Sequence, residues 1–116
     1  MQSSIVATIS LLSIMIAGYA HAAPGPSQAK QGQALAYSRS KGNCLACHTM
    51  KGSDVPSNVG PKLSNMKARF PNRNELFGII FDEEKRNPQT VMPPFGKNLI
   101  LSKSEINAII DFLYTM

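Results

Sequence analysis

The feature that most constrains this chain is a five-residue motif, Cys44-Leu45-Ala46-Cys47-His48. Two cysteines separated by two residues and followed by a histidine form the C-x-x-C-H signature of c-type haem attachment. On a helical turn both thiols face the same side, where they can bond to the two vinyl groups at one edge of a porphyrin. His48 then lies close to the iron and can bind it as the proximal ligand. The motif therefore predicts one covalent haem c, attached through Cys44 and Cys47.

Other interpretations of this motif fit the sequence less well. A thioredoxin-like C-x-x-C site lies beside a βαβ pattern, which this chain does not contain. A structural zinc site needs four ligands, and beyond residue 22 the chain has only one histidine and two cysteines. A structural disulfide between Cys44 and Cys47 remains as a minor alternative.

Residues 1–22 are predicted to be a signal peptide. The apolar stretch over residues 5–18 is too short to span a bilayer comfortably, and Ala20-His21-Ala22 fits the small-x-small cleavage rule. The first four residues contain no Lys or Arg, which departs from the usual pattern, so an uncleaved anchor helix is the alternative. We expect cleavage after Ala22, export to the periplasm and no stable membrane insertion after cleavage.

The net charge of +5 lies entirely in the part of the chain that follows residue 22. This excess of Lys and Arg favours an acidic protein partner or an anionic small molecule. Nucleic acid is not expected as a partner, because no basic run is interleaved with aromatic residues. A domain this small buries a modest core and usually needs a staple, and a haem is a large apolar group suited to that purpose.

The chain after residue 22 predicts an all-α fold with short helices and long loops. No segment alternates polar and apolar residues over a useful length, as a half-buried strand would. Long ordered loops are unusual in so small a domain unless they wrap a ligand. We expect a flexible lead-in segment over residues 23–30 and one haem-binding domain over residues 31–116. The expected helices cover residues 31–39, 63–70 and 73–85, and a last helix follows Ser102.

Several helix ends have local sequence signals. Gly42 is expected to follow the first helix in a left-handed conformation. Asn72 and Glu75 form a candidate N-cap pair for the third helix. Ser102 and Glu105 match the S-x-x-E capping box, which predicts the start of the last helix.

The sixth iron ligand is chosen from a short list, because His48 is the only histidine beyond residue 22. Ligation by two histidines of this chain is therefore excluded, which leaves a methionine, a lysine or an open position. Met50 is tied to the proximal side, Met116 ends the chain, and Met66 is more typical of core packing. Met92 lies in a loop stiffened by two prolines, which can present a thioether at a fixed distance. We expect Met92 as the ligand, opposite His48, with a hydrophobic loop anchor as the alternative role.

The chain resembles the class I cytochrome c family over most of its length beyond residue 22. The shared pieces are the C-x-x-C-H motif, a Gly-Pro-x-Leu segment from Gly60, Met92-Pro93 and the terminal pair Phe112-Leu113. The resemblance implies a class I cytochrome c fold and an electron-transfer role. It also implies that the carbonyl of Pro61 bonds to the second ring nitrogen of the proximal histidine.

That resemblance also implies a crossing of the N- and C-terminal helices. In the family a glycine and an aromatic side chain meet at this crossing. Gly32 and Tyr37 opposite Phe112 are the expected counterparts in this chain.

A narrower resemblance is to the SoxX family, the monohaem subunits of the SoxAX cytochromes of sulfur-oxidising bacteria. It rests on blocks around Cys44, at residues 58–61 and 68–71, and above all on Asn-Pro-Gln-Thr-Val-Met-Pro-Pro-Phe-Gly at residues 87–96. The resemblance implies a heterodimer with a SoxA-like dihaem or monohaem cytochrome subunit. SoxAX joins thiosulfate to a cysteine of the SoxYZ carrier, as an L-cysteine S-thiosulfotransferase. The SoxX-like subunit would pass the released electrons to a downstream acceptor.

The same resemblance implies that this chain is not catalytic alone, since haem attachment leaves it no free cysteine beyond residue 22. A freely diffusible periplasmic electron shuttle is the alternative function. A haem-based sensor is a third possibility, against which the stiff Met92 loop argues.

Two candidate roles remain open for Arg69, Lys62 and Phe95. Arg69 or Lys62 would pair with a haem propionate or lie on the solvated surface. Residues 82–86 are expected to form an exposed helix end. Phe95 would pack on the haem edge or on a partner.

Overall fold

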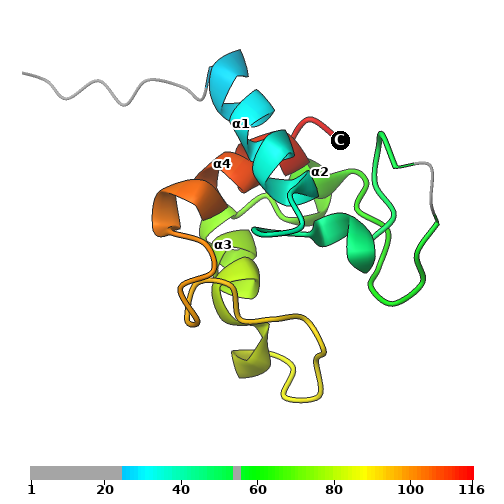
Figure 1. Ribbon diagram of the computed structural model, residues 1–116, viewed down its shortest axis with the longest axis vertical. Helices are drawn as coiled ribbons and strands as arrows, with labels where there is room; N and C mark the ends of the chain where they lie inside the picture. The colour runs from blue at the N-terminus through cyan, green and yellow to red at the C-terminus, as the bar shows by residue number, and fades with distance from the viewer. Residues whose placement is uncertain (1–24, 54–55) are drawn as a thin grey trace, which may run out of the picture.

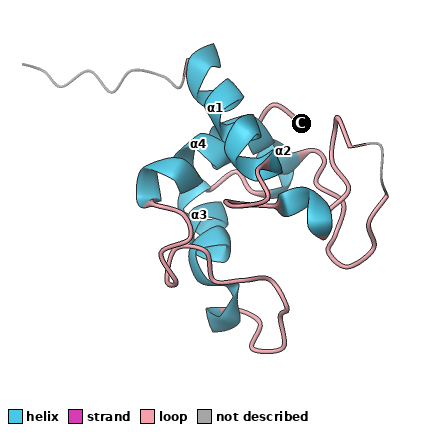
Figure 2. Cartoon of the chain, in the orientation of Figure 1, coloured by secondary structure: helices cyan, strands magenta, loops and turns pink. Residues whose placement is uncertain are grey.

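The computed structural model describes residues 25–53 and 56–116 (Figure 1). The predicted signal peptide and residues 23–24 lie outside the described residues. In the described ranges the chain forms α1 (Pro26–Tyr37), the 3-10 helix η1 (Cys44–Ala46), α2 (Met66–Arg69), α3 (Arg73–Asp82), the 3-10 helix η2 (Glu83–Lys85) and α4 (Lys103–Leu113). These ranges contain no β-strand (Figure 2), only an isolated parallel bridge between Met50 and Leu63. The predicted all-α class is confirmed.

Helix α1 begins earlier than the sequence analysis predicted. It starts at Pro26, whereas the expected start was residue 31. Proline suits the first helical turn because its φ is already helical and its missing N–H would have no partner there. The prediction of a flexible lead-in is therefore wrong for residues 26–30, which are helical.

Gly42 does not have the left-handed conformation that we expected. The left-handed residue is its neighbour Asn43, with φ 47°. Gly42 instead lies where the chain turns back on α1, and its N–H donates to the carbonyl of Leu35 at 3.0 Å. A Cβ at this position would lie 3.1 Å from Sγ of Cys44. Glycine is therefore required at residue 42 by close approach to α1 and Cys44, rather than by its backbone angles.

Helices α1 and α4 cross in direct contact and form the centre of the fold (Figure 1). A Cβ on Gly32 would overlap the backbone carbonyl of Ala108, so the two helices meet backbone to backbone. Beside this point the rings of Tyr37 and Phe112 pack edge to face, with centroids 5.7 Å apart. The predicted crossing of a glycine and aromatic side chains is confirmed.

The ends of α4 and α3 carry the predicted caps. The Ser102 hydroxyl accepts from the Glu105 N–H at 3.2 Å, and the Glu105 carboxylate accepts from the Ser102 N–H at 2.8 Å. That second bond and the Lys41 ammonium, 2.9 Å away, lower the pKa of Glu105. Asn72 is the N-cap of α3 as predicted, but its side chain accepts from the Asn74 N–H, at 3.0 Å, and not from Glu75.

Arg73 joins the start of α3 to α4. Its guanidinium donates to the side chain and the backbone carbonyl of Asn107, at 3.1 and 2.7 Å. It also pairs with the buried carboxylate of Asp111 at 2.5 Å. A buried carboxylate needs such a partner, because removing one member of a buried pair leaves an uncompensated charge. Arg73 therefore fixes α3 against α4.

The hydrophobic core lies among α1, α3 and α4 and extends to the loops that follow them. Met66 is buried in this cluster, which confirms its predicted role in core packing. The cluster comprises Ala36, Met50, Met66, Leu76, Ile80, Phe95, Leu101, Ile106, Ile109, Ile110, Phe112 and Leu113. No helix in the described ranges is both long and apolar enough to cross a membrane.

Residues 82–86 are not uniformly exposed, which corrects the prediction. Asp82 and Glu83 are buried, with 5% and 6% of their surface exposed, whereas Glu84 to Arg86 are exposed. The buried carboxylate of Glu83 pairs with the exposed guanidinium of Arg86, which lies 2.6 Å away. The charge pattern of the sequence did not reveal that this turn folds back against the loop that follows it.

Candidate haem site

The C-x-x-C-H motif forms one tight turn. The amides of Cys47 and His48 both donate to the carbonyl of Cys44, at 3.2 and 2.9 Å. Both cysteines are half-buried and are not joined by a disulfide. Burial raises the pKa of the Cys44 thiol to about 11, so this thiol is protonated at neutral pH.

The imidazole of His48 is held in one orientation. Its Nδ1–H donates to the carbonyl oxygen of Pro61 at 2.7 Å, so the hydrogen bond that the resemblance implied for Pro61 is present. A carbonyl can only accept, so Nδ1 carries a proton, and the neutral form of the ring has its lone pair on Nε2. Gly60 packs against the ring, and a Cβ there would lie 2.5 Å from Cε1 of His48. The turn thus presents an oriented nitrogen donor that suits a metal ion.

Several hydrogen bonds brace the loop that carries Gly60 and Pro61. The Thr49 hydroxyl donates to the carbonyl of Ser57 at 3.0 Å and accepts from its N–H at 2.8 Å. The Gly60 N–H donates to the carbonyl of Cys47 at 2.7 Å. Sequence reasoning missed Thr49 and Ser57, because no spacing rule links two hydroxyl residues across an irregular loop.

Met92 comes from a different segment, the loop between η2 and α4. Its N–H donates to the hydroxyl of Thr90 at 3.1 Å, and its half-buried side chain packs against the core. Cys44 borders the same core cluster. Phe95, three residues after Met92, is itself a buried member of that cluster. Neither of the two roles considered for Phe95 had placed it in the core.

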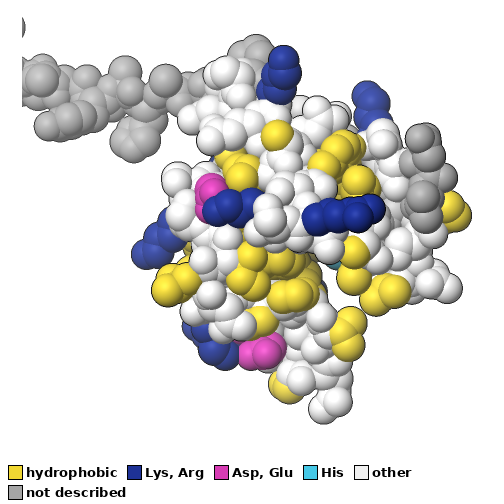
Figure 3. All heavy atoms as spheres, in the orientation of Figure 1, with side chains coloured by type: hydrophobic (Ala, Val, Ile, Leu, Met, Phe, Trp, Pro, Cys, Tyr) yellow, Lys and Arg dark blue, Asp and Glu magenta, His cyan; other side chains and the backbone are white. Residues whose placement is uncertain are grey.

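The surroundings of these residues are apolar and incompletely covered. Figure 3 shows hydrophobic side chains gathered in the middle of one face, beside α3. The half-buried set against the core includes Leu45, Phe77 and Phe81, and the last two rings are stacked with centroids 5.8 Å apart. An exposed apolar surface next to two thiols and an oriented imidazole is the donor set and lining that a covalent haem requires. The residues therefore fit this cofactor.

Arg69 is already engaged in the protein. Its guanidinium donates to the backbone carbonyls of Lys62 and Ser64, at 2.9 and 3.3 Å. It thereby braces the chain just after Pro61. The Lys62 side chain is exposed.

Comparison with known proteins identifies the family. The cytochrome c family model matches residues 29–116. This chain belongs to the cytochrome c family. Membership implies a covalent haem c and electron transfer by its iron, and the described chain has its cysteines at residues 44 and 47. The match begins close to the predicted domain start at residue 31.

The fold is shared with one solved cytochrome complex in particular. The crystal structure of SoxXA from P. pantotrophus superposes with a TM-score of 0.64 and 23% sequence identity. The superposition covers 74% of this chain and 79% of that chain. Among curated proteins no relative matches this chain.

Proposed function

We propose that this chain is the monohaem, electron-accepting subunit of a SoxAX-like cytochrome in the periplasm. In this proposal Cys44 and Cys47 hold the haem by thioether bonds, His48 and Met92 bind the iron, and Pro61 orients His48. The haem supplies one-electron chemistry at its iron when bound. The observation that carries the proposal is the hydrogen bond from His48 to Pro61, which orients Nε2 as the nitrogen that the iron would take.

The protein's own residues fix the iron environment in this proposal. The Nδ1–H bond to a neutral carbonyl holds the ring and raises the basicity of the ligating nitrogen. A thioether on the other side favours reduced iron and raises the reduction potential. If His48 and Met92 both held the iron as proposed, they would leave no position on it for a substrate, and the haem would supply electron transfer only.

The Met92→Leu variant tests the sixth ligand. Leucine keeps the volume and removes the sulfur, so the iron loses its thioether. We expect the midpoint potential to fall by on the order of 100 mV, since axial ligands set haem potentials over a range of about 0.8 V. We also expect the ferrous protein to bind CO readily. Potentiometry and absorbance spectroscopy measure both.

Met66→Leu is the matched control for this substitution. Met66 is 2% exposed in the core, so the same change there is a packing change of less than about 1.5 kcal/mol. Its potential and its CO binding should equal those of the wild type. Unchanged spectra and potential in Met92→Leu would refute the ligand assignment.

The distribution of charged residues along the chain supports an acidic partner. Residues 1–74 contain eight basic residues and one acidic residue, a net charge of +7. The rest of the chain contains four basic and six acidic residues, a net charge of −2. Six of the eight basic residues of the first part are exposed: Lys30, Arg39, Lys51, Lys62, Lys67 and Arg69. The excess of basic residues thus lies in the same stretch of sequence as the C-x-x-C-H motif, and a basic excess favours an acidic partner surface.

The partner assignment is tested by affinity capture of the processed holo-protein from its native periplasm, followed by haem staining and addition of thiosulfate. We expect a second haem-bearing chain at equal stoichiometry and reduction of both haems by thiosulfate only when the two are together. A haem protein that is captured alone, yet exchanges electrons rapidly with soluble acceptors, would instead support the diffusible shuttle. Absence of a covalent haem would refute both functions.

A further inference from the structure

The segment after Met92 is attached to the end of α3 at Phe81. The amides of Gly96 and Lys97 both donate to the Phe81 carbonyl, at 3.1 and 3.2 Å. Gly96 also lies so close to the Phe81 ring that a Cβ would overlap the ring carbons. The position of the Met92 loop therefore depends on this junction, which lies four to five residues beyond the methionine.

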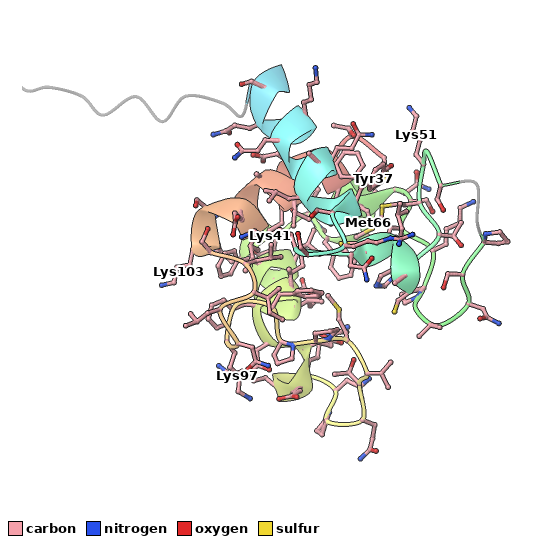
Figure 4. The ribbon with its side chains drawn as sticks, viewed as in Figure 1. Tyr37, Lys41, Lys51, Met66, Lys97 and Lys103 are labelled. Atoms are coloured by element: carbon pink, nitrogen blue, oxygen red, sulfur yellow. The ribbon has the colours of Figure 1, made fainter. Side chains whose placement is uncertain are left out.

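An ion triad covers the same junction. The Lys97 ammonium lies 2.9 Å from Oε2 of Glu84 and 3.8 Å from Oδ2 of Asp82. Asp82 is 5% exposed, and its other oxygen, Oδ1, is buried without a hydrogen-bond partner in the described part of the chain. Within those residues Lys97 is the only cation paired with Asp82. Figure 4 shows Lys97 beside the end of α3, whereas Lys103 lies apart on α4.

We propose that Lys97 is a positioning residue for Met92, the proposed sixth iron ligand. Lys97 compensates the buried carboxylate of Asp82 and thereby holds the Met92 loop against α3. The proposal rests on the assignment of Met92 as a ligand given above. Lys97 touches neither the iron nor a substrate in this role. It acts through Asp82 and the Phe81 junction.

The burial of Asp82 decides the size of this effect. The contact of Lys97 with Glu84 joins two half-exposed side chains, and such surface pairs contribute little to stability. Asp82 is different, because a buried carboxylate that loses its counter-charge is strongly unfavourable. When Lys97 is removed, the uncompensated charge of Asp82 destabilises the Phe81 junction. Movement of the Met92 loop away from α3 relieves this cost. Met92 then leaves the iron more often, and an added ligand competes more successfully for the vacant position.

The test is the imidazole affinity of the ferric holo-protein, measured by absorbance titration. We expect Lys97→Gln to raise this affinity about fivefold, which corresponds to roughly 1 kcal/mol. Adding Asp82→Asn to Lys97→Gln should return the affinity to within about twofold of the wild type, because the buried charge is then gone. Met92→Leu sets the upper limit of the affinity.

Two controls separate positioning from general effects. Lys103→Gln removes an exposed lysine that has no ion pair in the described residues, and it should leave the affinity unchanged. Arg73→Met breaks the distant clamp between α3 and α4, so it should lower the unfolding midpoint without raising imidazole affinity. A merely structural role for Lys97 predicts the same pattern as Arg73→Met.

Each outcome decides the matter. Wild-type affinity in Lys97→Gln, or an equal rise in Arg73→Met, would overturn the positioning role while leaving Met92 as the ligand. No recovery in the double variant would overturn the role of Asp82. If the wild type already binds imidazole as tightly as Met92→Leu, then Met92 is not the ligand, and the ligand assignment and the positioning role both fail.

Discussion

A variant with Cys44→Ser and Cys47→Ser will accumulate without covalent haem and without a cooperative fold. Serine cannot form the thioether bonds, and the half-buried apolar side chains around the site would then face water. A domain of this size buries too little apolar surface to tolerate that loss. Haem staining after denaturing electrophoresis should be negative, and the circular dichroism signal should melt without a transition.

The two single-cysteine variants should show a smaller loss of stability than the double variant. Cys47→Ser and Cys44→Ser each keep one attachment point, so each should retain haem staining with a lower unfolding midpoint than the wild type. A double variant that unfolds cooperatively at the wild-type midpoint would show that the fold does not depend on the attached cofactor. Haem that survives denaturation in the double variant would show that attachment does not use these cysteines.

The parts of this protein that could be predicted from sequence are those set by residues close together in the chain. The C-x-x-C-H turn is closed by hydrogen bonds to the carbonyl of Cys44, within five residues. The capping box of Ser102 and Glu105 spans four residues and appears as predicted. The position of Met66 in a helical stretch predicts core packing rather than iron ligation, and Met66 is buried in the core. Local chemistry determines each of these features.

The features that sequence analysis missed depend on tertiary contacts. Asp82 and Glu83 look like part of a solvated charge run, yet both are buried, and Lys97 from the following loop pairs with Asp82. Gly42 is needed for close approach to Leu35 and Cys44, which no turn rule anticipates. The spacing of residues in the sequence predicts neither the close contacts of Gly42 nor the burial of Asp82 and Glu83. In this protein such contacts also define the junction of the Met92 loop.

The two sides of the candidate haem site are therefore built differently. On the His48 side the proposed ligand is fixed within a short loop by its bond to the Pro61 carbonyl and by the contact of Gly60 with the imidazole. On the Met92 side the position of the loop depends on the Phe81 junction and on a half-exposed lysine. Backbone bonds of this kind change little with ionic strength, whereas ion pairs at the surface are screened by salt. Salt should therefore screen the exposed contact of Lys97 with Glu84 but not the backbone bonds on the His48 side.

Gly32→Ala will be the most damaging single-methyl change in the helical framework. The new Cβ would overlap the backbone carbonyl of Ala108, and a backbone atom cannot rotate away as a side chain can. Helices α1 and α4 must then separate, which loosens the packing of Tyr37 on Phe112 and of the buried face of α4. Overpacking of this kind costs about 1–3 kcal/mol and sometimes more. We expect a fall in melting temperature of roughly 4–24 °C, since each kcal/mol shifts a domain of this size by about 4–8 °C.

The same substitution at Gly78 is the matched control and should have the opposite sign. Gly78 lies inside α3, and a Cβ there would meet nothing within 4 Å. Alanine restricts the unfolded chain and favours the helix by about 0.5–1 kcal/mol, so Gly78→Ala should raise the melting temperature by about 4 °C. Thermal unfolding of the two holo-proteins under one set of conditions measures both changes. Because helix propensity would favour alanine equally at both positions, a destabilised Gly32→Ala beside a stabilised Gly78→Ala would isolate the backbone contact with Ala108. Stabilisation in both variants would instead mean that α1 and α4 do not meet backbone to backbone at Gly32.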